Sequence, residues 1–179
     1  MQDTLSAQGR RGYNHPMSDL CTPTATPFFE QQHAGLDAQL QAHLLDVAGA
    51  DFPTALQRLQ HWRRDLARHI EIENTRLLPH VPAGARWAAR VYLLEHERIT
   101  LLADEYEQRV QAVAAHPPQD ELARRRAVLR LLDAAHALRH VLEHHHAREE
   151  QALAQELPLE LQAAAWADEP APLGPMLFR

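Results

Sequence analysis

The stretch His145-His146-Ala147-Arg148-Glu149-Glu150 decides how the rest of this sequence is interpreted. It places Glu149 four residues after His145, and the same spacing occurs earlier in the chain at His69 and Glu73. Residues four apart share one face of a helix. Each pair can therefore direct an imidazole nitrogen and a carboxylate oxygen to one point, which favours metal binding by helices.

The composition excludes several classes of protein. With 179 residues the chain is long enough for one domain with a substantial core, and its formal net charge of -6 gives no electrostatic basis for binding nucleic acid or an anionic membrane surface. The single cysteine, Cys21, excludes a disulfide framework or a multi-cysteine metal site within one chain, and it fits a reducing compartment.

The sequence also lacks the features of an exported or membrane protein. Its first residues are polar and have no apolar segment of signal-peptide length, and no run approaches the roughly 20 apolar residues of a membrane span. A soluble cytoplasmic protein is therefore expected. Nothing in the sequence specifies an oligomeric state, and Met17 is left open as the natural start.

Apolar residues recur in steps of three and four through most of the chain, which predicts helices. The expected fold is all-α: an antiparallel up-down-up-down four-helix bundle with a short C-terminal helix and a flexible N-terminal leader. The predicted division is a leader at 1–26, a bundle at 27–160, and a C-terminal helix end and tail at 161–179. The helices are expected at about 27–48, 53–78, 84–115 and 119–157, and a short element at 159–166. Gly49 is the predicted stop signal of the first helix.

Six polar residues fall on the apolar stripes of these helices: His33, His69, Glu73, His96, His145 and Glu149. An ionised glutamate in a bundle core is strongly unfavourable unless it is paired or bound to a metal. Six ligands would saturate one octahedral ion. Two ions that share Glu73 and Glu149 would each take two histidines and keep positions open for water or a diatomic ligand. Imidazole and carboxylate ligands suit iron, manganese or zinc.

Together these motifs resemble the hemerythrin-like, HHE cation-binding family. The resemblance covers roughly residues 28 to 160, and the motifs that carry it are His33, His69-x-x-x-Glu73 with the trailing Leu77-Leu78-Pro79, Glu95-His96, and His145-x-x-x-Glu149-Glu150. It implies a centre of two iron ions, bridged by carboxylates and an oxo or hydroxo group, with O2 or NO as the diatomic partner. Manganese or zinc are possible substitutes for the iron.

The sequence departs from the oxygen carriers of that family. Those proteins have a further histidine four residues from the first on the third helix, where this chain has Tyr92 and Thr100. Their fourth-helix carboxylate follows its histidine by five residues, which would select Glu150. The four-residue spacing selects Glu149, as in bacterial repair-of-iron-centres proteins and iron-sensing members. We take Glu149 as the predicted ligand and Glu150 as the alternative. The resemblance then implies a more open and reactive iron centre.

Two functional classes and one structural alternative follow. The first is a di-iron protein that binds O2 or NO, or that reports the iron level. The second is an enzyme-like stress protein that acts on NO or peroxide or supplies iron to damaged iron centres. The third is a metal-free structural bundle. No catalytic residue is singled out, although the phenol of Tyr92 is predicted to hydrogen-bond a ligand of the centre.

The remaining histidines of the last long helix are not taken as ligands of the centre. His136, His140 and His144 are spaced by four, and a solvated helix face is favoured for them over a second metal site. His144 and His146 are expected to be bystanders of His145.

Overall fold

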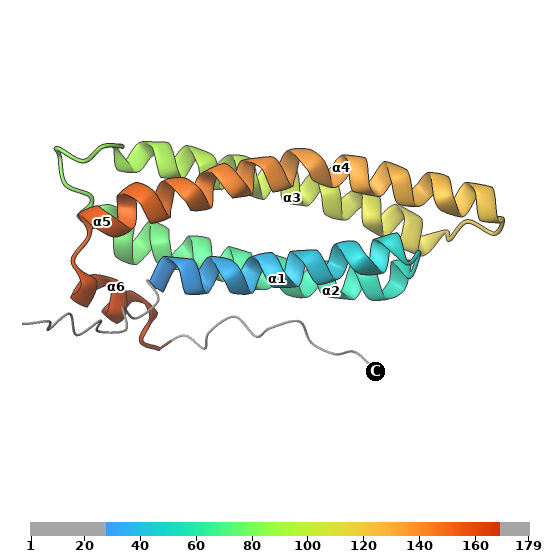
Figure 1. Cartoon of the computed structure of the whole chain (residues 1–179), viewed down its shortest axis with the longest axis horizontal. Helices are drawn as coiled ribbons and strands as arrows, with labels where there is room; N and C mark the ends of the chain where they lie inside the picture. The colour runs from blue at the N-terminus through green and yellow to red at the C-terminus, as the bar shows by residue number, and fades with distance from the viewer. Residues whose placement is uncertain (1–27, 169–179) are drawn as a thin grey trace, which may run out of the picture.

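The computed structural model describes residues 28–168, and this part of the chain is helical and contains no strand. Four long helices make up most of it: α1 (Phe28–Ala48), α2 (Phe52–Ile72), α3 (Ala89–Ala115) and α4 (Glu121–Arg148). They lie alongside one another (Figure 1), with α1 and α3 each packed against both α2 and α4. None of the described helices combines the length and the apolar composition that a membrane span needs.

Short elements continue α2 and α4. The π-helical turn η1 (Glu73–Leu77) and the 3-10 turn η2 (Leu78–His80) follow α2. The π-helical turn η3 (Glu149–Leu153), α5 (Ala154–Glu156) and α6 (Leu159–Trp166) follow α4. The short helix α6 packs on η1 at one end of the molecule (Figure 1). The predicted leader at 1–26, with Met17 and Cys21, lies outside the described residues, as does the tail from residue 169.

The predicted helical segments are present, but several of their boundaries differ. The third helix begins at Ala89, because residues 81–88 form an irregular connection of turns and bends. In this connection the backbone N–H of Arg86 donates to Glu156 at 2.6 Å. The second and fourth segments are interrupted, since each changes from α-helix to a π-helical turn at its glutamate.

The helix ends follow from local side chains. The carboxylate of Asp51 accepts a hydrogen bond from the backbone N–H of Thr54, and that of Asp120 caps α4 in the same way. At the end of α1 the left-handed residue is Ala50, with φ 57°, and not the predicted Gly49. The backbone N–H groups of Ala50 and Asp51 bond to the carbonyls of Val47 and Asp46, which is the Schellman pattern.

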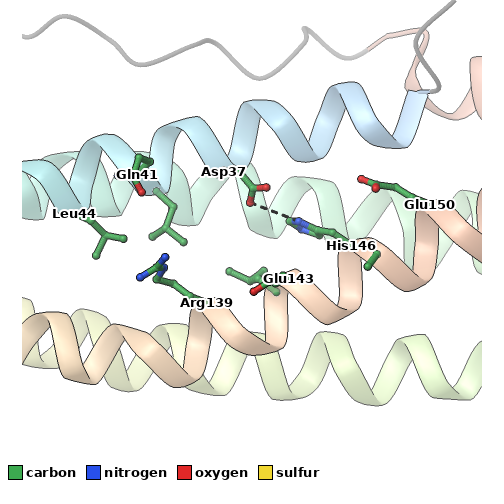
Figure 2. Close-up of a pocket in the computed structure, with 10 residues that line it drawn as sticks. Asp37, Gln41, Leu44, Arg139, Glu143, His146 and Glu150 are labelled. Carbon is green, nitrogen blue, oxygen red and sulfur yellow. Dashed lines mark ion pairs between the residues drawn. The ribbon is translucent and has the colours of Figure 1, made fainter.

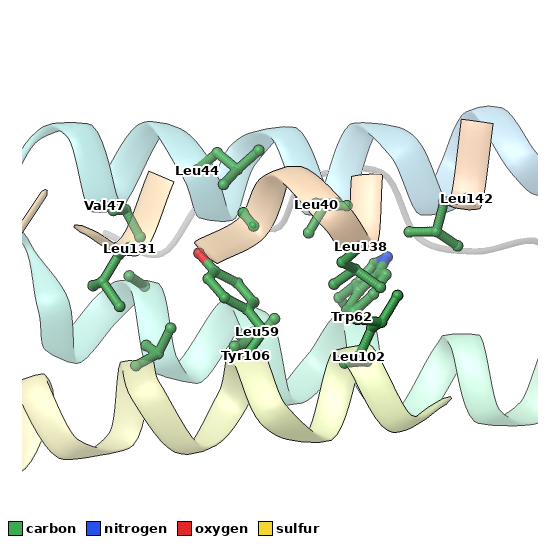
Figure 3. Packing of buried hydrophobic residues seen from close by; sticks show 14 of the residues in the cluster. Leu40, Leu44, Val47, Leu59, Trp62, Leu102, Tyr106, Leu131, Leu138 and Leu142 are labelled. Carbon is green, nitrogen blue, oxygen red and sulfur yellow. The ribbon is translucent and has the colours of Figure 1, made fainter. Parts of the chain in front are cut away.

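The apolar core is divided into two clusters. The larger one contains Trp62, Tyr106 and leucines from all four long helices (Figure 3). The smaller one lies at the α6 end and includes Phe29, Tyr92 and Trp166. Trp62, Tyr92 and Tyr106 are therefore core residues. On each long helix the predicted site residues fall between these clusters, so the two clusters enclose a polar layer.

Candidate metal centre

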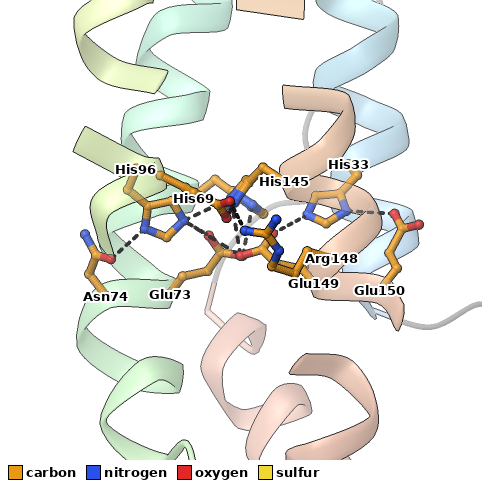
Figure 4. A network of polar contacts seen from close by, with 10 residues as sticks. His33, His69, Glu73, Asn74, His96, His145, Arg148, Glu149 and Glu150 are labelled. Carbon is orange, nitrogen blue, oxygen red and sulfur yellow. Dashed lines mark hydrogen bonds and ion pairs between the residues drawn. The ribbon is translucent and has the colours of Figure 1, made fainter. Parts of the chain in front are cut away.

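The six predicted site residues occupy this layer and come from every part of the bundle. The histidines are supplied by the four long helices, and the two glutamates begin the two π-helical turns: His33 on α1, His69 on α2, Glu73 on η1, His96 on α3, His145 on α4 and Glu149 on η3. None is more than 4% exposed. Their side chains point toward one another (Figure 4).

These side chains form two overlapping groups that can each hold a metal ion. One contains His33 and His69 and the other His96 and His145, and both contain Glu73 and Glu149. In each group the ligand atoms lie within 4.8 Å of one another. The structure thus gives two histidines to each group and both carboxylates to both groups.

The two oxygens of each carboxylate face different groups. In Glu73, Oε1 lies 3.1 Å from Nε2 of His69, while Oε2 lies 3.2 Å from Nε2 of His96. In Glu149, Oε2 lies 3.2 Å from Nε2 of His33, while Oε1 lies 3.3 Å from Nε2 of His145. Each carboxylate therefore has one oxygen near a histidine of each group.

The donor set fits a metal ion better than it fits direct pairing. Both oxygens of Glu73 and Glu149, and Nε2 of His33 and His69, are buried and have no aligned hydrogen-bond partner. Orphaned buried polar atoms of this kind are rare because they are unfavourable. Two ligands that are each about 2.0–2.1 Å from one ion, at about a right angle, lie about 3 Å apart. The observed spacings of 3.1 to 3.3 Å have this size.

Outer hydrogen bonds to the residues that directly follow the two glutamates orient two of the histidines. The Nδ1–H of His33 donates to Oε1 of Glu150 at 2.8 Å, and the Nδ1–H of His96 donates to Oδ1 of Asn74 at 2.7 Å. An oxygen at Nδ1 fixes the proton there, so the lone pair of the neutral ring lies on Nε2 and faces the centre. Asn74 and Glu150 each follow the glutamate of their repeat. This shared position after the glutamate of each His-x-x-x-Glu motif is the signal that could have identified the outer acceptors.

The other two histidines are held differently. The Nδ1–H of His145 donates to Glu95 at 3.1 Å, and Arg148 also pairs with that carboxylate. The ring of His69 stacks on Trp166, with centroids 5.1 Å apart and an interplanar angle of 22°. Sequence reasoning did not identify these roles of Arg148 and Trp166, because their partners are remote in the chain.

Glu149, Glu150 and His146 lie in different places relative to the two groups. Glu149 belongs to both ligand groups, whereas Glu150 contacts the outer nitrogen of His33. His146 belongs to neither ligand group, as expected of a bystander, but it contacts one of the predicted ligands. Its buried ring stacks on His33 with centroids 3.9 Å apart and an interplanar angle of 6°.

His43 provides a contrast within the same chain. It is fully buried, and both of its nitrogens have partners: Nδ1–H donates to the carbonyl of Ala55 at 2.7 Å, and Nε2 accepts from the hydroxyl of Tyr106 at 2.8 Å. Burial lowers the pKa of His43 and favours its neutral form. This is a satisfied core histidine, in contrast to His33 and His69, whose Nε2 atoms have no hydrogen-bond partner.

The electrostatics of the layer are dominated by the buried carboxylates. Burial by itself lowers the pKa of His33 and His96, but their contacts with Glu149 and Glu73 outweigh it and raise each pKa to about 9. Burial by itself raises the pKa of Glu73 and Glu149, but the surrounding histidines hold the pKa of Glu73 well below its ordinary value and that of Glu149 at about 2. Without metal, the glutamates are ionised and His33 and His96 carry protons.

Two cavities flank the layer. One, of about 410 Å³, is lined by Asp37, Arg139, His146 and Glu150 among others and lies between α1 and α4 (Figure 2). Another, of about 450 Å³, is lined by residues of α2, η1 and α3, including His96 and Thr100.

Tyr92 is fully buried, and its hydroxyl has no hydrogen-bond partner among the described residues. Burial and the nearby carboxylates of Glu156 and Glu149 raise the pKa of Tyr92 to about 12.

Comparisons of the chain with models of protein families, with curated proteins and with solved structures find no match. The case for a metal centre therefore rests on the geometry alone. The buried histidine and glutamate groups can hold metal, and they lie where helix periodicity predicts them.

Proposed function

We propose that this chain is a hemerythrin-like, HHE-type protein whose polar layer holds two iron ions, and that it binds O2 or NO or reports the iron level. The observation that carries the proposal is the placement of Glu73 and Glu149, each with one oxygen toward each histidine pair. When bound, two iron ions would supply redox-active, Lewis-acidic positions that small ligands can reach.

The protein residues have distinct parts in this proposal. His33 and His69 would hold one ion, and His96 and His145 the other, with both glutamates shared. The outer acceptors keep the histidine rings oriented, and the two apolar clusters exclude water from both ends of the layer. The up-down-up-down order of the long helices belongs to the proposal, and the short connections from α1 to α2 and from α3 to α4 support it.

A second candidate, an enzyme-like protein that acts on NO or peroxide or donates iron, is favoured by one feature. The positions four residues from His96 hold Tyr92 and Thr100, so α3 supplies one histidine where an oxygen carrier supplies two. Fewer protein ligands leave more positions for exogenous ones. The unpartnered hydroxyl of Tyr92 is a donor that such a ligand can use.

A metal-free structural bundle explains the polar layer less well. Natural structural bundles pair their buried polar groups, as His43 does here, whereas four carboxylate oxygens of the layer lack hydrogen bonds. Replacing them by apolar groups would remove the penalty, so their presence indicates a ligand.

Metal analysis tests the proposal directly. Protein purified from iron-replete cells is expected to contain close to two iron ions per chain, and His69→Gln is expected to reduce this content. His43→Gln is the matched control, because it alters an equally buried histidine outside the layer and should keep the metal. Purified wild-type protein without iron, manganese or zinc would refute the proposal.

Rapid mixing of the reduced, iron-loaded protein with O2 or NO separates the two functional classes. A stable and reversible spectral change indicates a binding or sensing protein. Irreversible oxidation with a released product indicates the enzyme-like alternative. Tyr92→Phe should alter the rate or the spectrum if its hydroxyl donates to the bound ligand, and identical behaviour would exclude that role.

A further inference from the structure

The outer face of α4 carries three histidines that the interior centre does not use. His136, His140 and His144 are all exposed. The rings of His136 and His140 have centroids 6.2 Å apart, and those of His140 and His144 are 4.4 Å apart. Within the part of the chain that the structure describes, no hydrogen bond or ion pair engages their nitrogens, so these nitrogens remain available. We call these three residues the histidine ladder.

Helix geometry keeps the ladder apart from the interior centre. Five residues at about 100° each place His140 about 140° around the helix axis from His145. The ladder thus faces solvent, while His145 and the buried leucines of α4 face the core. Residues four apart lie on neighbouring turns, with Cβ atoms about 5–6 Å apart. Small side-chain rotations can bring one nitrogen from each of two ladder residues to a common point.

We propose that the histidine ladder is a separate surface site for a divalent transition-metal ion that prefers imidazole, such as Cu²⁺, Ni²⁺ or Zn²⁺. Two imidazole nitrogens from successive turns would chelate the ion, and water or a ligand from solution would complete its shell. Asp133, exposed and one turn before His136, adds an oxygen donor on the same side of α4. This site does not depend on the occupancy of the interior centre.

His140 is the shared member of both possible chelating pairs. Its loss breaks the His136–His140 pair and the His140–His144 pair together, whereas loss of His136 or His144 leaves one pair intact. The affinity of a chelate exceeds that of a single ligand because the second contact is intramolecular. The ladder therefore predicts a specific order of effects among three chemically identical substitutions.

The test uses the full-length, tag-free chain and Ni²⁺ as the probe. Retention on immobilised Ni²⁺ reports only surface histidines, and a Ni²⁺ titration followed by NMR shows which histidine rings are broadened. We expect His140→Gln to weaken surface binding at least about tenfold. His136→Gln and His144→Gln should each weaken it less. His116→Gln is the matched control, since His116 is exposed but has no histidine three or four residues away.

The outcomes separate this site from the interior centre. Iron content after purification should be the same in His140→Gln as in the wild type, and circular dichroism should confirm that the fold is intact. Equal retention of wild type and His140→Gln, or equal loss in His116→Gln and His140→Gln, would overturn the ladder site. Neither result would change the conclusion about the buried groups, which is tested by iron content.

Discussion

At the scale of single residues, two completely buried and ionised glutamates define the polar layer. Glu73 and Glu149 keep a low pKa because histidines surround them, and they in turn raise the pKa of His33 and His96 to about 9. Ligation requires the neutral imidazole, so a metal ion and these two protons compete for the same nitrogens.

The first prediction concerns this competition. Near pH 7.5, metal binding should release about two protons, one each from His33 and His96. Their pKa is raised on folding, so in the metal-free protein their stabilising contribution is complete below pH 6.5 and is lost as the pH rises through about 9. The stability of the metal-loaded protein does not depend on those protons. The difference in melting temperature between loaded and metal-free protein should therefore widen from pH 6.5 to pH 9.

Calorimetry in buffers of different ionisation heat counts the released protons. Thermal melts at several pH values give the difference in melting temperature between loaded and metal-free protein. A binding heat that is independent of the buffer, together with a constant difference in melting temperature, would contradict the assignment of both histidines as ligands.

The second prediction uses two adjacent carboxylates. Glu149→Ala removes a donor that belongs to both ligand groups, so it should abolish binding of both ions. Glu150→Ala removes only the outer acceptor of His33 and should lower metal affinity by about 10- to 100-fold while two ions still bind at saturation. Metal titration of the two variants, with circular dichroism as a check of folding, makes the comparison. The reverse order of effects would make Glu150 the ligand.

At the scale of elements, the two π-helical turns are the main departure from a regular bundle. The carbonyls of Glu73 and Glu149 accept from the backbone N–H groups of Leu78 and Ala154, five residues later. Each turn thus contains one extra residue and shifts the stripe that follows it. Two consecutive residues are buried after each glutamate, Leu77 with Leu78 and Ala152 with Leu153. π-helical turns occur often at functional sites.

These turns mark the limit of what the sequence predicts. Steps of three and four were enough to identify the four helices and all six residues of the polar layer, because burial of one helix face enforces that period. A π-helical turn uses the same residue types as an α-helix, so periodicity cannot distinguish it beforehand. The late start of α3 was missed for another reason: its N-cap residue, Ala88, has no side-chain cap that the sequence could signal, and the preceding connection bonds to a distant residue, Glu156.

The third prediction concerns the end of α1, where the left-handed residue is Ala50. A non-glycine residue there costs roughly 1–2 kcal/mol, and a new glycine costs about 0.5–1 kcal/mol through the unfolded chain. Ala50→Gly should therefore stabilise the protein by about 0.5–1 kcal/mol. In Gly49→Ala the new Cβ would lie 3.5 Å from the carbonyls of Leu45 and Asp46, an ordinary contact, so no loss is expected.

Denaturant unfolding of the two single variants, and of the double variant that carries both substitutions, measures these effects. The opposite pattern, with Gly49→Ala destabilising and Ala50→Gly neutral, would restore Gly49 as the stop signal that the sequence suggests.

At the scale of the whole molecule, the polar layer connects all four long helices between two apolar clusters. The smaller cluster is completed by α6, whose Trp166 stacks on His69. Arg76, one residue before the end of η1, donates to the carbonyl of Ala165 at 2.9 Å and holds α6 in place. The C-terminal helix therefore covers the His33–His69 side of the layer. Metal binding on that side should alter the environment of Trp166.

The fourth prediction follows from that contact. Of the three tryptophans in the chain, Trp166 alone stacks on a residue of the layer, whereas Trp62 lies in the larger cluster and Trp87 is partly exposed beneath Arg148. Loading the protein with a paramagnetic ion should quench tryptophan fluorescence, and Trp166→Phe should remove most of that change. Trp62→Phe and Trp87→Phe should keep it. Steady-state and lifetime fluorescence of chelator-treated and reloaded protein measures the effect. If quenching survives in Trp166→Phe but is lost in Trp87→Phe, the bound ion lies outside the layer and the buried groups are not its site.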